Sequence, residues 1–256
     1  MFLHYHGQRV YYETAGSGDP ILLLHGWGVD SGSLRPIFSY VRDALGMRPV
    51  ALDFPGFGLS DPPIVAWGAM DFSRLVLSLM DKLDLGGADV LAHSFGGRVA
   101  INLAAKNPER VRRLVLVDSA GLRPPRTAQY RTRVGLAKAV RTVSKALPES
   151  GGHWLQKHVL GRIGSTDYRT AGPMRPTFVK IVNEDLRDLL PSVRSPTLLI
   201  WGARDTATPL EVGDTMHGLL PDSRLEVLPA AGHFAWMDDW SGFTRALSDF
   251  LGGAQR

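Results

Sequence analysis

The sequence predicts an α/β fold built on a mostly parallel, doubly wound sheet with helices on both faces. Short apolar runs typical of buried strands alternate with segments whose apolar residues recur at helical spacing. Candidate catalytic residues follow three of these runs, where open α/β sheets place their ligands. The 256 residues, 44% hydrophobic and 21% charged, have the size and composition of one globular unit.

The expected elements follow one another along the chain. A hairpin that turns near His6-Gly7 comes first, because glycine tolerates the backbone of a tight turn. A helix over residues 97–106 ends at Asn107-Pro108, since the residue before a proline avoids helical backbone. The other expected helices cover 34–45 and 72–83, and the later strands cover 21–24, 49–52, 89–92, 113–117 and 224–229, with one more that starts at Pro196.

Residues 91–97, Leu-Ala-His-Ser-Phe-Gly-Gly, have the pattern of a nucleophile elbow, in which a strand turns sharply into a helix. The small residues Ala92 and Gly96 flank Ser94 at two positions' distance, because bulky side chains would collide across such a turn. The turn forces the serine into a strained, positive-φ conformation that holds Oγ clear of the backbone. It also places the N–H of Phe95 at a helix N-terminus, where an oxyanion can be bound.

A serine nucleophile needs a base, and the base needs an acid that orients it. Asp205 follows the strand that starts at Pro196, and His233 follows the strand that ends at Pro229. Asp118 is a rival acid because it also ends a strand. We prefer Asp205, since Thr-Ala-Thr-Pro after it forms a loop into a helix start, and we expect Asp118 to shape the hinge of the next segment.

The loop His25-Gly26-Trp27-Gly28 follows the strand at 21–24. Its glycines let backbone approach backbone, so the N–H of Trp27 is the expected partner of the Phe95 N–H in an oxyanion hole. We expect His25 to be structural and to hydrogen-bond loop backbone. The glycine- and proline-marked loop at 53–61 is expected to buttress the site; no Gly-Lys-Ser/Thr follows, so it is not a phosphate-binding loop.

The chain resembles the α/β-hydrolase superfamily over nearly its whole length, and most closely its small capped esterases and lipases. Ala92 stands where the commonest elbow has glycine; as the next smallest residue, it leaves the turn intact. The resemblance implies an α/β-hydrolase fold with Ser94, Asp205 and His233 as catalytic triad, in that chain order. The motifs that carry it are the 25–28 loop, the 53–61 loop, the Ser94 elbow, the Asp205 loop and Gly232-His233-Phe234.

The alternation of strands and helices stops between about Gly121 and Pro191, where helical runs cover 130–147 and 177–189. An insertion after the sixth strand is where the superfamily carries its lid. The resemblance therefore implies a core of residues 1–120 and 192–256 and a helical cap of residues 121–191. The expected residues of the substrate pocket between them are His93, Trp154 and Phe234, and His93 could instead only pack beside the elbow.

The implied activity is hydrolysis of carboxylic esters with small to medium acyl chains through an acyl-enzyme, with no metal or cofactor. Haloalkane dehalogenases and epoxide hydrolases share the fold but use an aspartate nucleophile, so Ser94 argues against both. A carbon–carbon bond hydrolase of acidic, dienoate-type substrates uses the same triad and stays open, as do hydroxynitrile lyase and perhydrolase activities. The non-enzymatic alternative is a ligand receptor on a hydrolase fold.

Composition and charge indicate where the protein acts and what it can bind. The chain has no cysteine, no apolar run long enough to span a membrane and no secretory signature, so a cytoplasmic protein is expected. Net charge is +4, yet ten basic residues and one acid lie between Arg110 and Lys145. We favour a solvated outer face there over steering of anionic substrates, an acidic partner or a lipid surface. No nucleic-acid-binding module accompanies the charge, and no feature indicates an oligomeric state.

Overall fold

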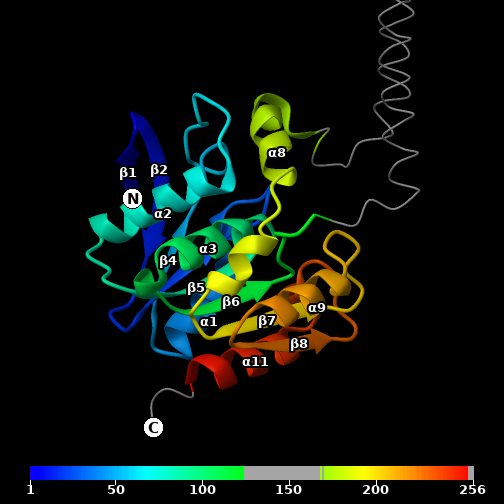
Figure 1. Cartoon of the computed structure of the whole chain (residues 1–256). Coiled ribbons are helices and arrows are strands. Elements are labelled where there is room, and N and C mark those ends of the chain that lie inside the picture. The colour runs from blue at the N-terminus through cyan, green and yellow to red at the C-terminus, as the bar shows by residue number, and fades with distance from the viewer. Residues whose placement is uncertain (124–167, 169, 253–256) are drawn as a thin grey trace, which may run out of the picture.

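The computed structural model describes residues 1–123, 168 and 170–252 (Figure 1). The strands are β1 (Phe2–Tyr5), β2 (Gln8–Thr14), β3 (Pro20–Leu24), β4 (Arg48–Leu52), β5 (Ala88–His93), β6 (Val111–Val117), β7 (Thr197–Gly202) and β8 (Ser223–Leu228). The α-helices are α1 (Arg35–Asp43), α2 (Ala69–Lys82), α3 (Phe95–Lys106), α8 (Arg175–Val182), α9 (Leu210–Leu219), α10 (Ala235–Asp238) and α11 (Trp240–Gly252). Short 3₁₀ helices are η1 (Ser31–Leu34), η2 (Pro108–Arg110), η4 (Gly172–Met174) and η5 (Arg187–Ser192).

The strands form one eight-stranded sheet in the order β1-β2-β4-β3-β5-β6-β7-β8. Pairing is antiparallel for β1 with β2 and for β2 with β4, and parallel from β4 to β8. Every residue of β5 and β7 is buried, which explains why these strands are continuous apolar runs in the sequence. The predicted mostly parallel sheet is confirmed.

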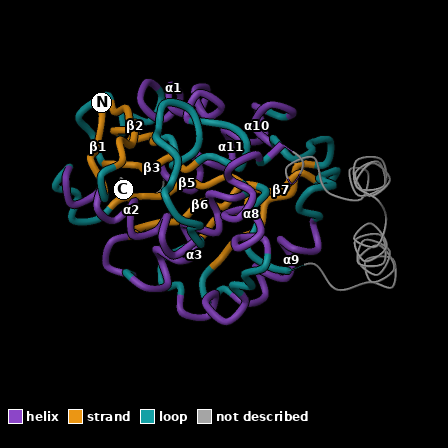
Figure 2. The backbone as a smooth tube through the Cα atoms, turned by 90° about the horizontal axis from the view of Figure 1, so that it is seen from above, coloured by secondary structure: helices purple, strands orange, loops and turns teal. Residues whose placement is uncertain are grey.

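Helices cover both faces of this sheet (Figure 2). Helices α1, α10 and α11 lie on one side of the strands, and α2, α3 and α9 lie on the other. Each layer has its own apolar core: Phe38, Trp236 and Phe243 belong to the first, and Phe72 and Val99 to the second. Because helices cover both faces of the sheet, residues that can meet a ligand lie in the loops at the ends of its strands.

The β1–β2 hairpin turns at His6-Gly7, as predicted. Both residues have positive φ, 49° for His6 and 79° for Gly7. Tyr5 pairs with Gln8, so the loop between the strands has two residues. This is the turn whose twist matches that of the two strands it joins, and glycine adopts the second position without strain.

The long insertion between β6 and β7 lies where the sequence placed it, and its described part differs from the expected helix at 177–189. Helix α8 ends at Val182, and η5 begins only at Arg187. The side chain of Asn183 donates to the carbonyl of Val179, and the N–H of Leu186 donates to the carbonyl of Gly121, the first residue of the insertion. The predicted helix at 130–147 and Trp154 lie outside the described residues.

None of the helices that the structure describes is long and apolar enough to cross a membrane.

Candidate active site

The elbow has the predicted geometry. Strand β5 ends at His93, α3 begins at Phe95, and Ser94 between them has φ 50° and ψ −112°. A Cβ on Gly96 would collide with the carbonyl of Leu24 on the neighbouring strand, so only glycine fits there. The turn is held by N–H groups of Gly97 and Ala120, which both donate to the carbonyl of Ser94.

Three residues that are far apart in the sequence meet at this elbow. The Nε2 atom of His233 lies 3.0 Å from Oγ of Ser94, and its Nδ1 lies 2.8 Å from Oδ2 of Asp205. An ionised carboxylate can only accept a hydrogen bond, so the neutral imidazole carries its proton on Nδ1, which donates to Asp205. Its Nε2 is then free to accept the proton of the serine hydroxyl. Such a chain of contacts is what general-base activation of a serine requires.

The carboxylate of Asp205 is held in an environment that keeps it ionised. It accepts from the N–H groups of Ala207 and Thr208, at 2.7 and 3.1 Å. The hydroxyl of Thr208 lies 2.6 Å from Oδ2 of Asp205 and 2.9 Å from the carbonyl of Asp118, and donates to one of them. Burial alone would raise the pKa of Asp205, but the bonds from His233 and Thr208 outweigh it and lower the pKa.

Asp118, the rival acid, makes other contacts. Its Oδ1 accepts from the N–H of Gly202 at 2.8 Å, and its Oδ2 accepts from the N–H of Ala235 at 3.1 Å. The carboxylate therefore ties the end of β7 to the start of α10, two residues after His233. Burial, with repulsion from Asp205, outweighs these donors and raises the pKa of Asp118 to about 7.

The loop after β3 lies directly against the elbow. A Cβ on Gly26 would lie 3.4 Å from Cβ of Ser94, and the rings of Trp27 and Phe95 meet edge to face at 5.6 Å. Phe95 is the first residue of α3, where a backbone N–H has no acceptor within the helix. His25 acts as predicted: it donates from Nδ1 to the carbonyl of Gly26 and accepts at Nε2 from the N–H of Phe54.

Two of the expected pocket residues, His93 and Phe234, pack against the imidazole of His233. His93 is 1% exposed, and its ring contacts those of His233, Phe234 and Trp236. Neither His93 nor Phe234 is among the described residues that line the cavity in front of Ser94. The third, Trp154, lies outside the described residues.

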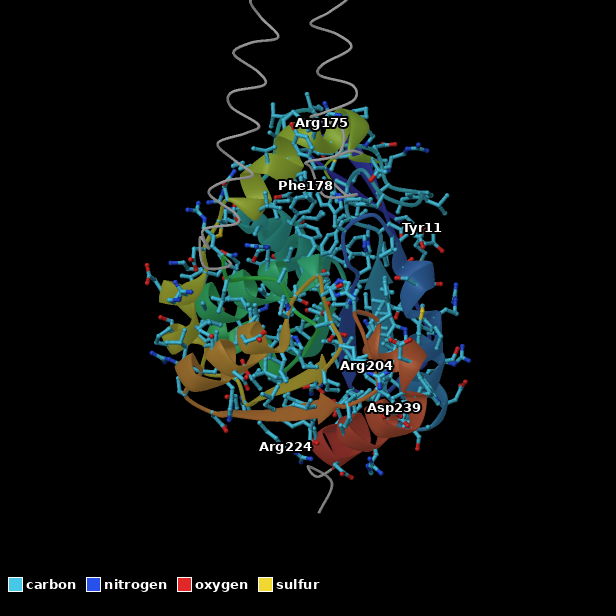
Figure 3. The ribbon with its side chains drawn as sticks, turned by 90° about the vertical axis from the view of Figure 1, so that its right-hand side faces the viewer. Tyr11, Arg175, Phe178, Arg204, Arg224 and Asp239 are labelled. Atoms are coloured by element: carbon cyan, nitrogen blue, oxygen red, sulfur yellow. The ribbon has the colours of Figure 1, made fainter. Side chains whose placement is uncertain are left out.

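A cavity of about 940 Å³ opens in front of Ser94 and His233. Trp27 and Phe95 line it from the core, and Phe178 and Ile181 line it from α8. In Figure 3 Phe178 lies on the part of α8 nearer the core, whereas Arg175 lies at its outer end. The rings of Phe178 and Trp27 are 5.1 Å apart, so α8 packs over the expected oxyanion loop.

Two residues near the site were not singled out from the sequence. Thr208 lies three positions after Asp205, the spacing at which a side chain bonds its own turn. Arg98 is the one charged residue in the segment 95–104, and it lines the cavity. A cation four positions after a nucleophile, on the same helix face, is the signal that marks it. Among residues 1–123, 168 and 170–252, no cluster of histidine, aspartate or glutamate is arranged to hold a metal ion.

Known proteins resemble this chain over nearly its whole length. Among curated proteins, the chain is 29% identical to a 2-hydroxymuconate semialdehyde hydrolase of Pseudomonas putida, over 97% of this chain and 92% of that protein. It is 26% identical to a pimeloyl-[acyl-carrier protein] methyl ester esterase of Chromobacterium violaceum, over 95% of this chain and 98% of that protein.

Solved structures share the fold. An esterase of Exiguobacterium antarcticum superposes with a TM-score of 0.75 at 23% identity, covering 98% of this chain and 99% of the esterase. A hydrolase of Pseudomonas aeruginosa superposes with a TM-score of 0.76 at 24% identity, covering 99% and 98% of the two chains. Residues 19–239 match the alpha/beta hydrolase fold family, and the chain therefore belongs to that family.

Proposed function

We propose that this protein is a serine hydrolase that cleaves carboxylic esters of small to medium acyl chains through an acyl-enzyme. The observation that carries the proposal is the continuous contact from Ser94 Oγ through His233 to Asp205, at 3.0 and 2.8 Å. A hydroxyl on a strained turn, a base with its free nitrogen on that hydroxyl and a buried acid on the other nitrogen form a nucleophilic site.

The first half of the reaction acylates the serine. His233 takes the proton of Ser94 at Nε2 as Oγ attacks the ester carbonyl, and Asp205 stabilises the imidazolium that forms. The carbonyl oxygen becomes an oxyanion, which accepts hydrogen bonds from the N–H groups of Trp27 and Phe95. When the carbon–oxygen bond of the ester breaks, His233 gives its proton to the leaving alcohol.

The second half releases the acid. Water takes the place of the alcohol and gives a proton to Nε2 of His233 as its oxygen attacks the acyl carbon. The second tetrahedral intermediate collapses, Oγ of Ser94 regains the proton, and the carboxylic acid leaves. The apolar walls at Phe178 and Ile181 suit an acyl chain of modest length. We also propose that residues 121–191 serve as a cap over the 1–120 and 192–256 core, with α8 as its described wall.

A second candidate is hydrolysis of a carbon–carbon bond in an acidic dienoate. It is favoured by the similarity to the Pseudomonas putida relative, whose name gives 2-hydroxymuconate semialdehyde as its substrate. It uses the same serine, histidine and aspartate. The two candidates differ in the bond broken, and therefore in which substrates turn over.

Steady-state hydrolysis of p-nitrophenyl esters from acetate to palmitate, beside Ser94→Ala, tests the proposal. Turnover that disappears in the variant, with an optimum at short or medium chains, is the expected result. Dienoate ring-fission products are assayed in parallel by their loss of absorbance. Serine-dependent turnover of these alone would favour the second candidate, and no turnover of either by the folded protein would favour a receptor.

A further inference from the structure

Arg98 is a buried cation in the wall of the cavity. It is the fourth residue of α3 and lies one helical turn, about 5.4 Å, from Ser94 along the helix axis. The residue is 6% exposed, and it lines the same cavity as Ser94 and His233. A group bound to its guanidinium would therefore belong to the molecule whose carbonyl meets Oγ of Ser94.

The guanidinium has few partners within the part of the chain that the structure describes. Its Nη1 donates to the carbonyl of Glu184 at 2.9 Å, and no carboxylate there lies within ion-pair distance of it. The nearby acids are occupied. The carboxylate of Glu184 accepts from the N–H of Ala69, and Asp185 pairs with Arg187 at 3.4 Å.

Burial lowers the pKa of Arg98 to about 10, so it still carries its charge at neutral pH. The carboxylates of Glu184 and Asp185 oppose this shift, but neither forms an ion pair with Arg98, so they offset only part of the solvation that the buried guanidinium loses. Three arginines, Arg98, Arg123 and Arg187, and one acid, Asp185, line the cavity, so the described wall favours an anion. A guanidinium presents parallel N–H groups that match the two oxygens of a carboxylate.

We propose that Arg98 binds a carboxylate of the substrate, and that the preferred substrates are half-esters of short dicarboxylic acids. The ester carbonyl lies at Ser94, and the free carboxylate lies one helical turn away at the guanidinium. This inference rests on the proposed ester hydrolysis and adds to it the chemical class of the acyl group. Arg98 is in this account a specificity-determining residue that takes no part in bond breaking.

The test compares monomethyl and dimethyl esters of succinate, glutarate and adipate, assayed by acid release. The wild type should prefer the half-ester. Arg98→Met should lower the ratio of kcat/KM for half-ester over diester by about 10- to 100-fold, mainly through KM, as expected for the loss of a charge-assisted hydrogen bond. Arg98→Lys keeps the charge but loses the two parallel N–H groups of the guanidinium, and its ratio should lie between those of the wild type and Arg98→Met. It also serves if Arg98→Met does not fold.

Arg175→Met is the matched control, because Arg175 lies at the outer end of α8 (Figure 3) and is not among the described residues that line the cavity. It should change the ratio by less than about threefold. An equal loss on half-ester and diester in Arg98→Met would mean that Arg98 only supports the segment at Glu184, and would overturn the proposal. So would a wild type that prefers the diester.

A binding measurement separates this inference from the proposed function. If the wild type hydrolyses neither ester, the ester-hydrolase proposal fails, and calorimetric binding of monomethyl glutarate to Ser94→Ala still tests the subsite. Tighter binding to Ser94→Ala than to Ser94→Ala/Arg98→Met supports a carboxylate site. Equal binding, or none to either variant, overturns it.

Discussion

The imidazole of His93 donates from Nε2 to the backbone carbonyl of His233, with 2.8 Å between the two atoms. His93 precedes Ser94 in the chain, so this bond links the strand that carries the expected nucleophile to the loop that carries the expected base. Burial, and repulsion from His233, lower the pKa of His93 to about 3, so it is a neutral ring at any working pH. We infer that it positions His233.

Loss of this bond should slow the reaction without abolishing it. We expect His93→Ala to lower kcat by about 10- to 100-fold, the value of one buried hydrogen bond, with a smaller change in KM. His93→Gln places an amide N–H near the position of Nε2 and should recover part of the loss. Steady-state kinetics of both variants decide the point; a pair that is equally impaired would mean that only the packing of the ring matters.

The identity of the acid is tested by two matched aspartates. Asp205→Asn should lower kcat by about 10⁴-fold, because an amide at Oδ2 no longer favours the proton on Nδ1 of His233. Asp118→Asn should cost far less, since Asp118 bonds the backbone of Gly202 and Ala235 instead. Kinetics of the folded variants decide between them, and a larger loss in Asp118→Asn would assign the acid to Asp118.

Asp118 should also make stability depend on pH. Its pKa is raised from an ordinary 3.8 to about 7, because burial disfavours the ionised form. The folded protein thus holds this proton more tightly than the unfolded chain does. The stability that results is fully present below the pKa of Asp118 in the unfolded chain, 3.8, and is lost as the pH rises through its pKa in the folded protein, about 7.

Chemical denaturation of the wild type and Asp118→Asn across this range isolates the effect, because all other groups are shared. The free energy of unfolding of the wild type, relative to that of the variant, should fall by a few kcal/mol, at most about 4. A difference that is constant or rises with pH would mean that the donors from Gly202 and Ala235 hold Asp118 ionised.

The elbow should tolerate no side chain at Gly96. A Cβ there meets the backbone carbonyl of Leu24, which is fixed in the sheet, so Gly96→Ala should destabilise the fold by about 1–3 kcal/mol. Gly218 in α9 is the control, because no atom lies within 4 Å of a Cβ built on it. Gly218→Ala should be neutral or slightly stabilising. Thermal unfolding measures the stability of both variants. Equal changes in Tm would mean that a Cβ at Gly96 is not crowded by the carbonyl of Leu24.

The local features of the site could be predicted because short-range chemistry determines them. The φ of 50° at Ser94 follows from small residues around one turn, and the turn at His6-Gly7 follows from one glycine. The positions of Asp205 and His233 followed from strands that run parallel, so that their carboxyl ends share an edge.

Features that depend on tertiary contacts could not be predicted. The loop sequence after Asp205 favoured it as the acid, but the bonds of Asp118 to the backbone of Gly202 and Ala235 could not be read from its place at the end of a strand. Spacing did not reveal that His93 and Phe234 pack against the imidazole of His233. The helix expected at 177–189 is interrupted because Leu186 is bound to Gly121, a partner 65 positions earlier in the chain.

The most direct test of the account is covalent labelling with a fluorophosphonate, read by intact mass and peptide mapping. We expect one phosphonate per chain, on Ser94, absent from Ser94→Ala and formed far more slowly in Asp205→Asn. Such a label requires a serine activated by a neighbouring base, whatever the natural substrate is. A label on another residue, or none on the folded wild type, would contradict the assignment of Ser94 as nucleophile.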